Sequence, residues 1–373
     1  MLSSLLGVRL ILLTGKTVPL PAPFDVANAL SSVEVRNDTG GAGDGFQITF
    51  ALGKDKGIEY GLLASGALDL YSRVILGVLL GAIPEVLIDG IITHHEITPS
   101  NEPGRSTLTV SGRDVSVMLD LEEKDESYPN QPDFVIVTSL LARYAQFGLV
   151  PVPTPTADVP IMLQRIPRQA ETDLRFIQRL AQRNGYVFYI EPLTFGVNTA
   201  YFGPENRLSL PQPALTMNLG EATNVRRLSF TNDALAPVST EGTLLEPISK
   251  TAIPIPALPS LRVPPLSLRP TETRRKVRLR QAANQSPAQA AASAIASVTN
   301  APDAVTGTGE LESVRYGHVL RARKLVGVRG AGLSYDGFFY VRRVTHQIAR
   351  GSYTQSFTIS REGTMTLTPV VLP

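Results

Sequence analysis

Residues 171–191, ETDLRFIQRLAQRNGYVFYIE, constrain the fold of this chain most, because they predict a helix that runs directly into a strand. Thr172 is a suitable N-cap, and Asp173 places negative charge in the first turn, where the helix dipole favours it. Gly185 stands where a glycine commonly ends a helix. The pattern then changes to that of a strand at residues 186–190. No catalytic group lies within this unit.

One face of the predicted helix is apolar and the other is basic. The apolar stripe, at helical spacing, is formed by Leu174, Ile177 and Ala181, flanked by Phe176 and Leu180. The opposite face carries Arg175, Arg179 and Arg183. We therefore expect the apolar stripe to be buried.

The composition excludes several classes of protein. A chain of 373 residues should form two or more domains with sizeable cores. Its net charge of +2 gives no overall attraction to nucleic acid or to a membrane surface. The absence of cysteine excludes disulfides, thiolate zinc sites and cysteine nucleophiles.

Two apolar runs resemble targeting or membrane segments without meeting their requirements. Residues 1–13 have no basic start, are interrupted by Arg9 and lack a cleavage site of small residues. Residues 74–92 contain Pro84, Glu85 and Asp89, whereas a membrane span needs about 20 largely uncharged residues. Two buried strands joined near residues 81–84 fit this second run better.

The periodicity changes three times along the chain. Residues 1–113 alternate as strands, for example at 33–36, 46–50, 96–98 and 106–110, with a glycine-rich turn at 39–45. Residues 114–185 are helical, with Pro132 at the first position of a helix whose apolar stripe ends near Gly148. Strands return at 186–230 and again at 310–368, where we expect them at 316–326, 338–348 and 353–360.

The segment between these last two blocks is dense in proline. Residues 236–271 contain eight prolines, so we expect them to run extended over a surface without forming a ladder. A short alanine-rich helix should follow at 288–298, capped by Ser286 with Pro287 in its first position. The β blocks at the two ends share no evident sequence identity, although both consist of long alternating strands.

Metal binding has one candidate cluster. His94 and Glu96 would share one face of a strand while His95 points away, so at most two ligands converge locally. Zinc would need further ligands from His318, His346 or a distant carboxylate. A solvated strand edge is the simpler interpretation, and we predict no metal site and no cofactor.

Other charged and glycine-rich runs are weak candidates. The acidic residues of 120–126 could supply paired carboxylates for glycoside hydrolysis, but such runs are usually solvated. Residues 274–280, RRKVRLR, could contact phosphates, yet no aromatic residue interleaves for base stacking. The glycines of 327–332 lack the strand and helix of a phosphate loop. We predict no catalytic residue and no enzyme activity.

Three stretches together resemble the phage late-control D and baseplate-hub family. They are residues 108–120, LTVSGRDVSVMLD; the helix–strand unit at 171–191; and FYVRRVTH at 339–346 with YTQSFTISR at 353–361. Each has a plain structural explanation by itself, but their order and spacing extend over nearly the whole chain. The family also includes the N-terminal hub part of the type VI secretion spike protein VgrG.

The resemblance implies a mainly β fold with an α/β insertion and two tube-protein-like β-barrels per chain, which form a pseudo-hexameric ring as a homotrimer. The implied organisation is a first barrel at 1–113, a helical α/β domain at 114–200, strands of the second barrel at 201–235, a proline-rich segment with a short helix at 236–306, and the rest of the second barrel at 307–373. The ring would join a sixfold inner tube to a threefold spike within a baseplate.

The implied partners are other copies of the chain, the inner tube protein, baseplate wedge or LysM-type proteins, and a spike. Because the sequence ends soon after the last family motif, we expect the OB-fold and β-helix spike to be a separate polypeptide. We expect neither specific nucleic-acid binding nor membrane insertion, and assembly in the cytoplasm into a phage tail or an injection particle. A tail-tip cell-wall hydrolase and a carbohydrate-binding tail protein are the alternatives; the second would need exposed aromatics, and the chain has no Trp.

Overall fold

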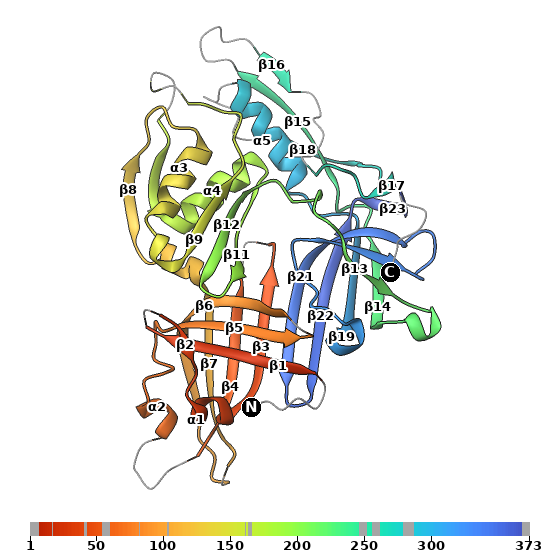
Figure 1. The fold of residues 1–373 in the computed structure, drawn as a ribbon. Coiled ribbons are helices and arrows are strands. Elements are labelled where there is room, and N and C mark those ends of the chain that lie inside the picture. The colour runs from red at the N-terminus through yellow and green to blue at the C-terminus, as the bar shows by residue number, and fades with distance from the viewer. Residues whose placement is uncertain are drawn as a thin grey trace.

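The protein is built around one continuous 13-stranded sheet, with an α/β block and a smaller three-stranded sheet beside it (Figure 1). This computed structural model describes residues 7–16, 18–40, 43–53, 60–81, 83–102, 104–160, 162, 166–245, 252–255, 262–278 and 287–367. The expected fold class, mainly β with an α/β insertion, is confirmed. No helix among the described residues is long and apolar enough to span a membrane.

The first half of the sheet, here called the first β unit, lies within residues 8–114. Its strands are β1 (Val8–Gly15), β2 (Leu20–Pro21), β3 (Leu30–Asp38), β4 (Gly45–Leu52), β5 (Arg73–Leu80), β6 (Ile83–Thr98) and β7 (Ser106–Asp114). They pair in the order β3-β4-β7-β6-β5-β1-β2. Two short helices, α1 (Phe24–Ala29) and α2 (Gly61–Ala64), connect them. The strands predicted in this region, including the two expected within 74–92, are confirmed.

The other half, the second β unit, combines two distant parts of the chain. Its strands are β13 (Gln212–Thr216), β14 (Val225–Asn232), β19 (Val305–Glu312), β20 (Leu325–Arg329), β21 (Gly337–Ala349) and β22 (Ser352–Arg361). They pair in the order β14-β19-β22-β21-β20-β13, with the helical turns η3 (Gly220–Ala222) and α6 (Ser313–Tyr316) between strands.

The strand predicted at residues 316–326 is wrong. Most of that stretch is an irregular connection between α6 and β20, although Val319 and Leu320 are buried as a strand would require. The backbone of Leu320 is satisfied by a side chain instead of a ladder: its N–H donates to Gln355 Oε1 (3.1 Å), and its carbonyl accepts from Gln355 Nε2 (2.9 Å). A buried amide thus replaces a neighbouring strand.

The two β units have the same strand path. Matching β1, β3, β4, β5, β6 and β7 in chain order to β13, β14, β19, β20, β21 and β22 reproduces every pairing among these strands; the short β2 has no counterpart. Two of the register shifts coincide as well: β3 and β14 shift register after Leu30 and Val225, and β6 and β21 shift after Ile92 and Val341. One difference is that β1 pairs antiparallel with β5, whereas β13 pairs parallel with β20.

The connections that precede β5 and β20 also share a backbone conformation and a hydrogen bond. Tyr71 and Arg323 both have a left-handed backbone, with φ of 63° and 65°. The Tyr71 N–H donates to Ile92 O (2.8 Å), and the Arg323 N–H donates to Val341 O (2.7 Å). A non-glycine residue with positive φ is uncommon, so its recurrence at matching places indicates that one strand plan occurs twice.

The α/β block lies against the first β unit (Figure 1). Its elements are η1 (Val115–Leu119), β8 (Glu123–Ser127), α3 (Asp133–Ala142), η2 (Ala145–Phe147), β9 (Leu149–Pro153), β10 (Arg168–Thr172), α4 (Asp173–Asn184), β11 (Val187–Thr194) and β12 (Val197–Gly203). Pro132 occupies the N-cap position of α3 and not the first helical position predicted for it. Gly148, φ 72°, ends η2.

The predicted helix–strand unit of residues 171–191 is confirmed as α4 and β11. Thr172 Oγ1 accepts from the N–H of Arg175, and Gly185 closes the helix with φ 67°. All five residues of the apolar stripe are buried in the core of the α/β block, while Arg175 and Arg179 are exposed.

The proline-rich region forms more strand than predicted. It contains β15 (Val238–Leu245), β16 (Ala252–Ile255), β17 (Ser267–Pro270) and β18 (Arg275–Arg278), and β16-β15-β18 is a ladder. The prolines fit because β16 is an edge strand and Pro270 ends β17, where a missing N–H costs little. The alanine-rich helix is α5 (Pro287–Thr299); Ser286 lies outside the described residues. The last strand, β23 (Gly363–Thr366), pairs with β17.

Candidate functional site

The histidines considered as metal ligands are not brought together. His94, His95 and Glu96 lie on the outer half of β6, whereas His346 is fully buried in β21. His346 Nδ1 lies 2.8 Å from the Tyr353 hydroxyl, and Nε2 lies 3.2 Å from Asn37 Oδ1. Burial, and then the positive charge of Arg321, lower the pKa of His346 to about 3. In the described part of the chain, no three His, Asp or Glu side chains converge as metal ligands would.

Two carboxylates of the acidic run at residues 120–126 are held in ion pairs. Arg168 binds Asp125 and Arg143 binds Glu126, in each case through two hydrogen bonds. The hydrogen bonds from Arg143 lower the pKa of Glu126 to about 2. A general acid in glycoside hydrolysis needs a raised pKa, so this arrangement favours a structural role.

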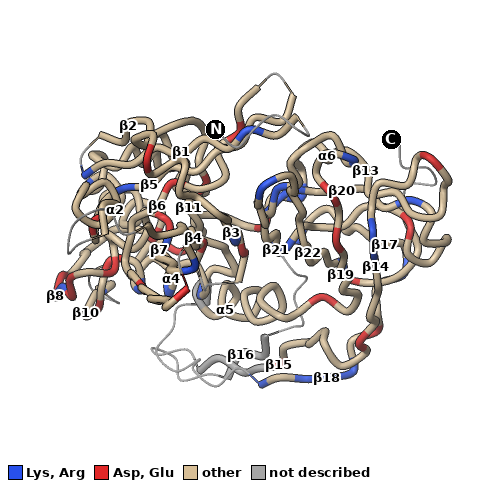
Figure 2. Tube along the Cα trace, turned by 90° about the horizontal axis from the view of Figure 1, so that it is seen from below, with Lys and Arg blue, Asp and Glu red and all other residues tan. Residues whose placement is uncertain are grey.

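The basic and glycine-rich runs have ordinary structural surroundings. Arg274 pairs with Glu272, and Lys276 of β18 pairs with Glu241. Figure 2 shows acidic and basic positions interspersed along the chain, with basic positions along β18. Residues 327–332 are the end of β20 and a turn, and the strand β21 follows, so no helix N-terminus is present for phosphate.

The seam between the two β units contains polar contacts that the sequence did not suggest. Strands β3 and β21 pair antiparallel from Asp38 opposite Arg343 to Ser32 opposite Ala349, and Arg343 Nε donates to Asp38 Oδ2 (2.7 Å). Beside them, the buried Arg323 donates to both carboxylate oxygens of Asp44, at 2.5 and 2.9 Å. This ion pair joins side chains separated by 279 positions.

Arg323 links three parts of the molecule. In addition to Asp44, it donates to the carbonyl of Asp38 (2.7 Å), and its guanidinium stacks on the ring of Tyr189 in β11 at 4.4 Å. Asp114 lies next to Asp44 in the same buried site, and its carboxylate accepts from the Asp44 N–H. Burial and the negative charge of Asp44 raise the pKa of Asp114 to about 6. One buried cation therefore holds the first β unit, the second β unit and the α/β block together.

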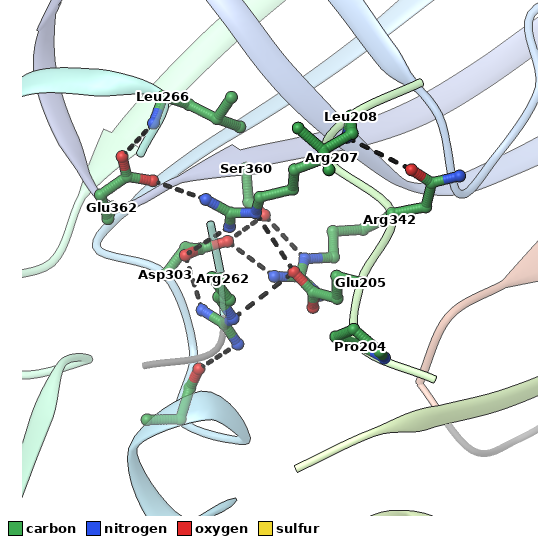
Figure 3. A network of polar contacts seen from close by, with 12 residues as sticks. Pro204, Glu205, Arg207, Leu208, Arg262, Leu266, Asp303, Arg342, Ser360 and Glu362 are labelled. Carbon is green, nitrogen blue, oxygen red and sulfur yellow. Dashed lines mark hydrogen bonds and ion pairs between the residues drawn. The ribbon is translucent and has the colours of Figure 1, made fainter. Parts of the chain in front are cut away.

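A second buried cluster gathers three arginines and three carboxylates (Figure 3). Asp303 is at its centre: its Oδ1 accepts from Arg262 (2.7 Å), and its Oδ2 accepts from Arg342 (2.7 Å) and from the Ser360 hydroxyl (2.6 Å). Arg207 donates to Glu362 (2.9 Å) and lies 3.6 Å from Asp303. Glu205 completes the cluster by pairing with Arg342.

The cluster joins five segments of the chain. Glu205 and Arg207 follow β12, Arg262 belongs to the proline-rich segment, Asp303 lies between α5 and β19, Arg342 is at the bulge of β21, and Glu362 follows β22. Burial by itself would raise the pKa of Asp303, but the surrounding guanidiniums hold it below its usual range. Because three positive and three negative charges compensate one another, the arrangement suits a structural joint and offers no general base or nucleophile.

One large cavity, of about 680 Å³, lies where the two β units meet the α/β block. Its lining includes Glu85 from β6, Glu191 from β11, and His318 and Arg321 from the connection before β20. Arg321 is bound to Glu85 at 2.9 Å, so the charges that line the cavity are partly paired. The described residues that line this cavity include no paired nucleophile and base.

Neither a protein-family model nor a curated protein sequence matches the chain. Several solved structures, however, are similar to it. A tail protein of Neisseria meningitidis is 15% identical with a TM-score of 0.62, covering 96% of this chain and 98% of that one. A 43 kDa prophage tail protein of Shewanella oneidensis is 12% identical with a TM-score of 0.61, covering 95% and 98%.

A third similar structure is an Escherichia coli component of the type VI secretion system, described as structurally similar to phage tail proteins. It is 15% identical with a TM-score of 0.55, and the match covers 92% of this chain and 77% of that one. At these identities the likeness establishes the fold. The chain thus has the fold of phage tail and type VI secretion proteins along almost its whole length.

Proposed function

We propose that this protein is the structural hub of a contractile tail or injection machine. Three copies form a ring that joins a sixfold inner tube to a threefold spike within the baseplate. The observation that carries this proposal is the duplicated β unit. A ring of three chains with two similar units each presents six near-equivalent positions to a tube and three to a spike.

The distribution of buried charge supports a mechanical role. An adaptor that transmits force needs its parts fixed to one another, and the Arg323–Asp44 pair and the Asp303 cluster do this at both junctions of the second β unit. Removing one member of such a buried pair costs about 3–5 kcal/mol. In the proposed ring the units 1–113 and 201–235 with 307–373 form the two tube-like barrels, and the block 114–200 lies outside the lumen.

The proposed partners follow from this position in the particle. They are two further copies of the chain, the inner tube protein, a separate spike protein and the wedge or LysM-type proteins of the baseplate. Assembly takes place in the cytoplasm, after which the protein is part of the tail or injection particle. We propose no catalytic role, because Asp125 and Glu126 of the acidic run are held by arginines.

Light scattering on the purified protein, with and without its cognate spike protein, tests the proposal. We expect a mass of three chains, and electron microscopy should show a ring with an open centre. A monomer that stays monomeric in the presence of the spike would contradict the hub assignment. Release of fragments from peptidoglycan by the purified protein would instead support the hydrolase alternative.

A further inference from the structure

In the part of the chain that the structure describes, the two β units leave open edges at places that match the seam inside the chain. We propose that β14 of one copy pairs antiparallel with the outer half of β6, residues 93–98, in the next copy, in the register that β3 and β21 use internally. This inference rests on the proposed ring and adds to it the contact that closes the ring and the residues opposite one another in it.

The outer half of β6 corresponds to the part of β21 that forms the internal seam. Both strands are longer than their neighbours, and both bulge midway, at Thr93 and Arg342. Before the bulge, β6 pairs with β5 and β21 pairs with β20. Beyond the bulge, β20 no longer pairs with β21, and β3 pairs with β21 along that edge instead. The corresponding part of β6 pairs with β7 alone among the described strands.

Strand β14 corresponds to β3 in the same way. Counting from their matched bulges, residues 35–38, VRND, align with residues 230–233, FTND. Asp38 and Asp233 make the same local turn, since each accepts from the N–H two residues later, at 2.8 and 2.9 Å. Strand β3 is paired on both edges, whereas β14 ends the sheet and pairs with β19 alone in the described structure.

Transferring the internal register predicts the opposing residues. Asp38 opposite Arg343 becomes Asp233 opposite His94, and Arg36 opposite Thr345 becomes Thr231 opposite Glu96. The intermediate pair is Asn232 opposite His95, and the next is Phe230 opposite Ile97. The ion pair of Arg343 with Asp38 thus has a counterpart in which a histidine faces an aspartate.

Surface features at the outer half of β6 agree with a missing strand. Ile97 is 40% exposed and Tyr71, which matches the buried Arg323, is 65% exposed. His95 Nε2 is shielded from solvent but has no hydrogen-bond partner in the described structure, and the predicted register places Asn232 opposite it. An edge with unpaired backbone groups and exposed apolar side chains favours strand addition.

A second copy is the occupant that the geometry specifies. Within one chain, β19, β22, β21, β3, β4 and β7 separate β14 from β6, and these two strands do not pair with each other. The internal seam already shows that the two kinds of edge fit each other. Repeating that contact between chains gives a head-to-tail interface, which closes into a ring when the rotation is suitable.

Engineered disulfides test the register, because the natural chain contains no cysteine. Glu96→Cys combined with Thr231→Cys places both thiols on exposed, directly opposed positions of the predicted pairing. Opposed residues lie within disulfide distance, whereas diagonal neighbours about 7–8 Å apart do not. The matched control is Glu96→Cys with Ser229→Cys, which keeps the same face of β14 and shifts the register by two residues.

After mild oxidation and denaturation, the first variant should migrate as covalent dimers and trimers, and the control should remain at the mass of one chain. Light scattering on the reduced proteins reports the assembly separately. A trimer in which the control links and the first variant does not, or in which neither links, would overturn the proposed register while leaving the hub intact. A protein that stays monomeric and unlinked with its spike present would overturn both.

Discussion

The two β units follow one strand plan but use their edges differently, and the difference separates folding from assembly. The edge β3 of the first unit is closed by β21 within the chain, with Asp44 and Arg323 buried beside it. The corresponding strand β14 pairs with β19 alone in the described structure, and Tyr71, which matches Arg323, is exposed. The same backbone contact thus stabilises the monomer at one place and is available to a second copy at the other.

The cores of the two units explain why their sequences look unrelated. In the first unit, Phe46 fills the space above Gly90 and Gly112, where an added Cβ would lie 2.8 and 2.7 Å from its ring. In the second, Phe357 covers Gly309, with the corresponding distance 2.4 Å. The register aligns Phe46 with Gly307 and Val110 with Phe357. The aromatic ring that packs on glycine therefore comes from β4 in the first unit and from β22 in the second. The core is filled in both units, although by residues on different strands.

The largest expected difference between the units is at the closed and open edges. Asp44→Ala leaves Arg323 as an unpaired charge inside the seam, and we expect the free energy of unfolding to fall by about 3–5 kcal/mol. Asp233→Ala, on the open edge, should change it by about 0.5 kcal/mol in the isolated chain. Urea denaturation of both variants at low protein concentration measures the contrast. Equal losses would mean that the two edges are not distinguished in the monomer.

Acid should weaken the closed seam through His346. Its pKa is lowered to about 3 in the folded protein, so the unfolded chain takes up a proton first as the pH falls below about 6.5. Its contribution to stability is present above pH 6.5 and is lost at about 1.4 kcal/mol per pH unit, or about 3 kcal/mol by pH 4.5. His346→Gln should remove this part of the slope in urea titrations across that range. An unchanged slope would show that the histidine is accessible to protons in the folded state.

Asp114 acts in the opposite direction. Because burial and Asp44 raise its pKa to about 6, its contribution is present below the unfolded pKa near 4 and is lost as the pH rises through 6. Asp114→Asn should therefore stabilise the protein at pH 7.5 by about 3 kcal/mol and leave it unchanged near pH 4. Comparing each variant with the natural chain at every pH separates this effect from that of His346. Destabilisation at pH 7.5 would show that the negative charge on Asp114 is needed.

The exchange of glycine and aromatic residues gives the smallest effect. Gly309→Ala places a Cβ 2.4 Å from Phe357 Cζ and 2.6 Å from the Arg227 carbonyl, so we expect a loss of about 1–2 kcal/mol. Gly53→Ala, where no atom lies within 4 Å, is the control and should change stability by less than about 0.5 kcal/mol. Thermal melting of the two variants is sufficient to compare them. No loss at Gly309 would show that β19 adjusts its distance from β22.

Local chemistry made part of this structure predictable from the sequence. The cap at Thr172, the left-handed Gly185 and the buried stripe from Leu174 to Ala181 were all found because a helix end depends on a few neighbouring residues. The long alternating strands were found for the same reason. The connection at 316–326 and the ladder in the proline-rich segment were missed, because a distant glutamine and an edge position replaced the expected local pattern.

The sequence by itself therefore determined the main helices, most strands and the β-rich class. It did not determine which strand edges meet, or that Asp303 would be surrounded by three arginines from three separate segments. Periodicity and capping act over one or two turns, whereas strand pairing and buried ion pairs depend on groups up to hundreds of positions apart. Only the tertiary structure decides which of those groups become neighbours. Burying a charge costs desolvation free energy, and this cost is offset only when packing places an oppositely charged group beside it.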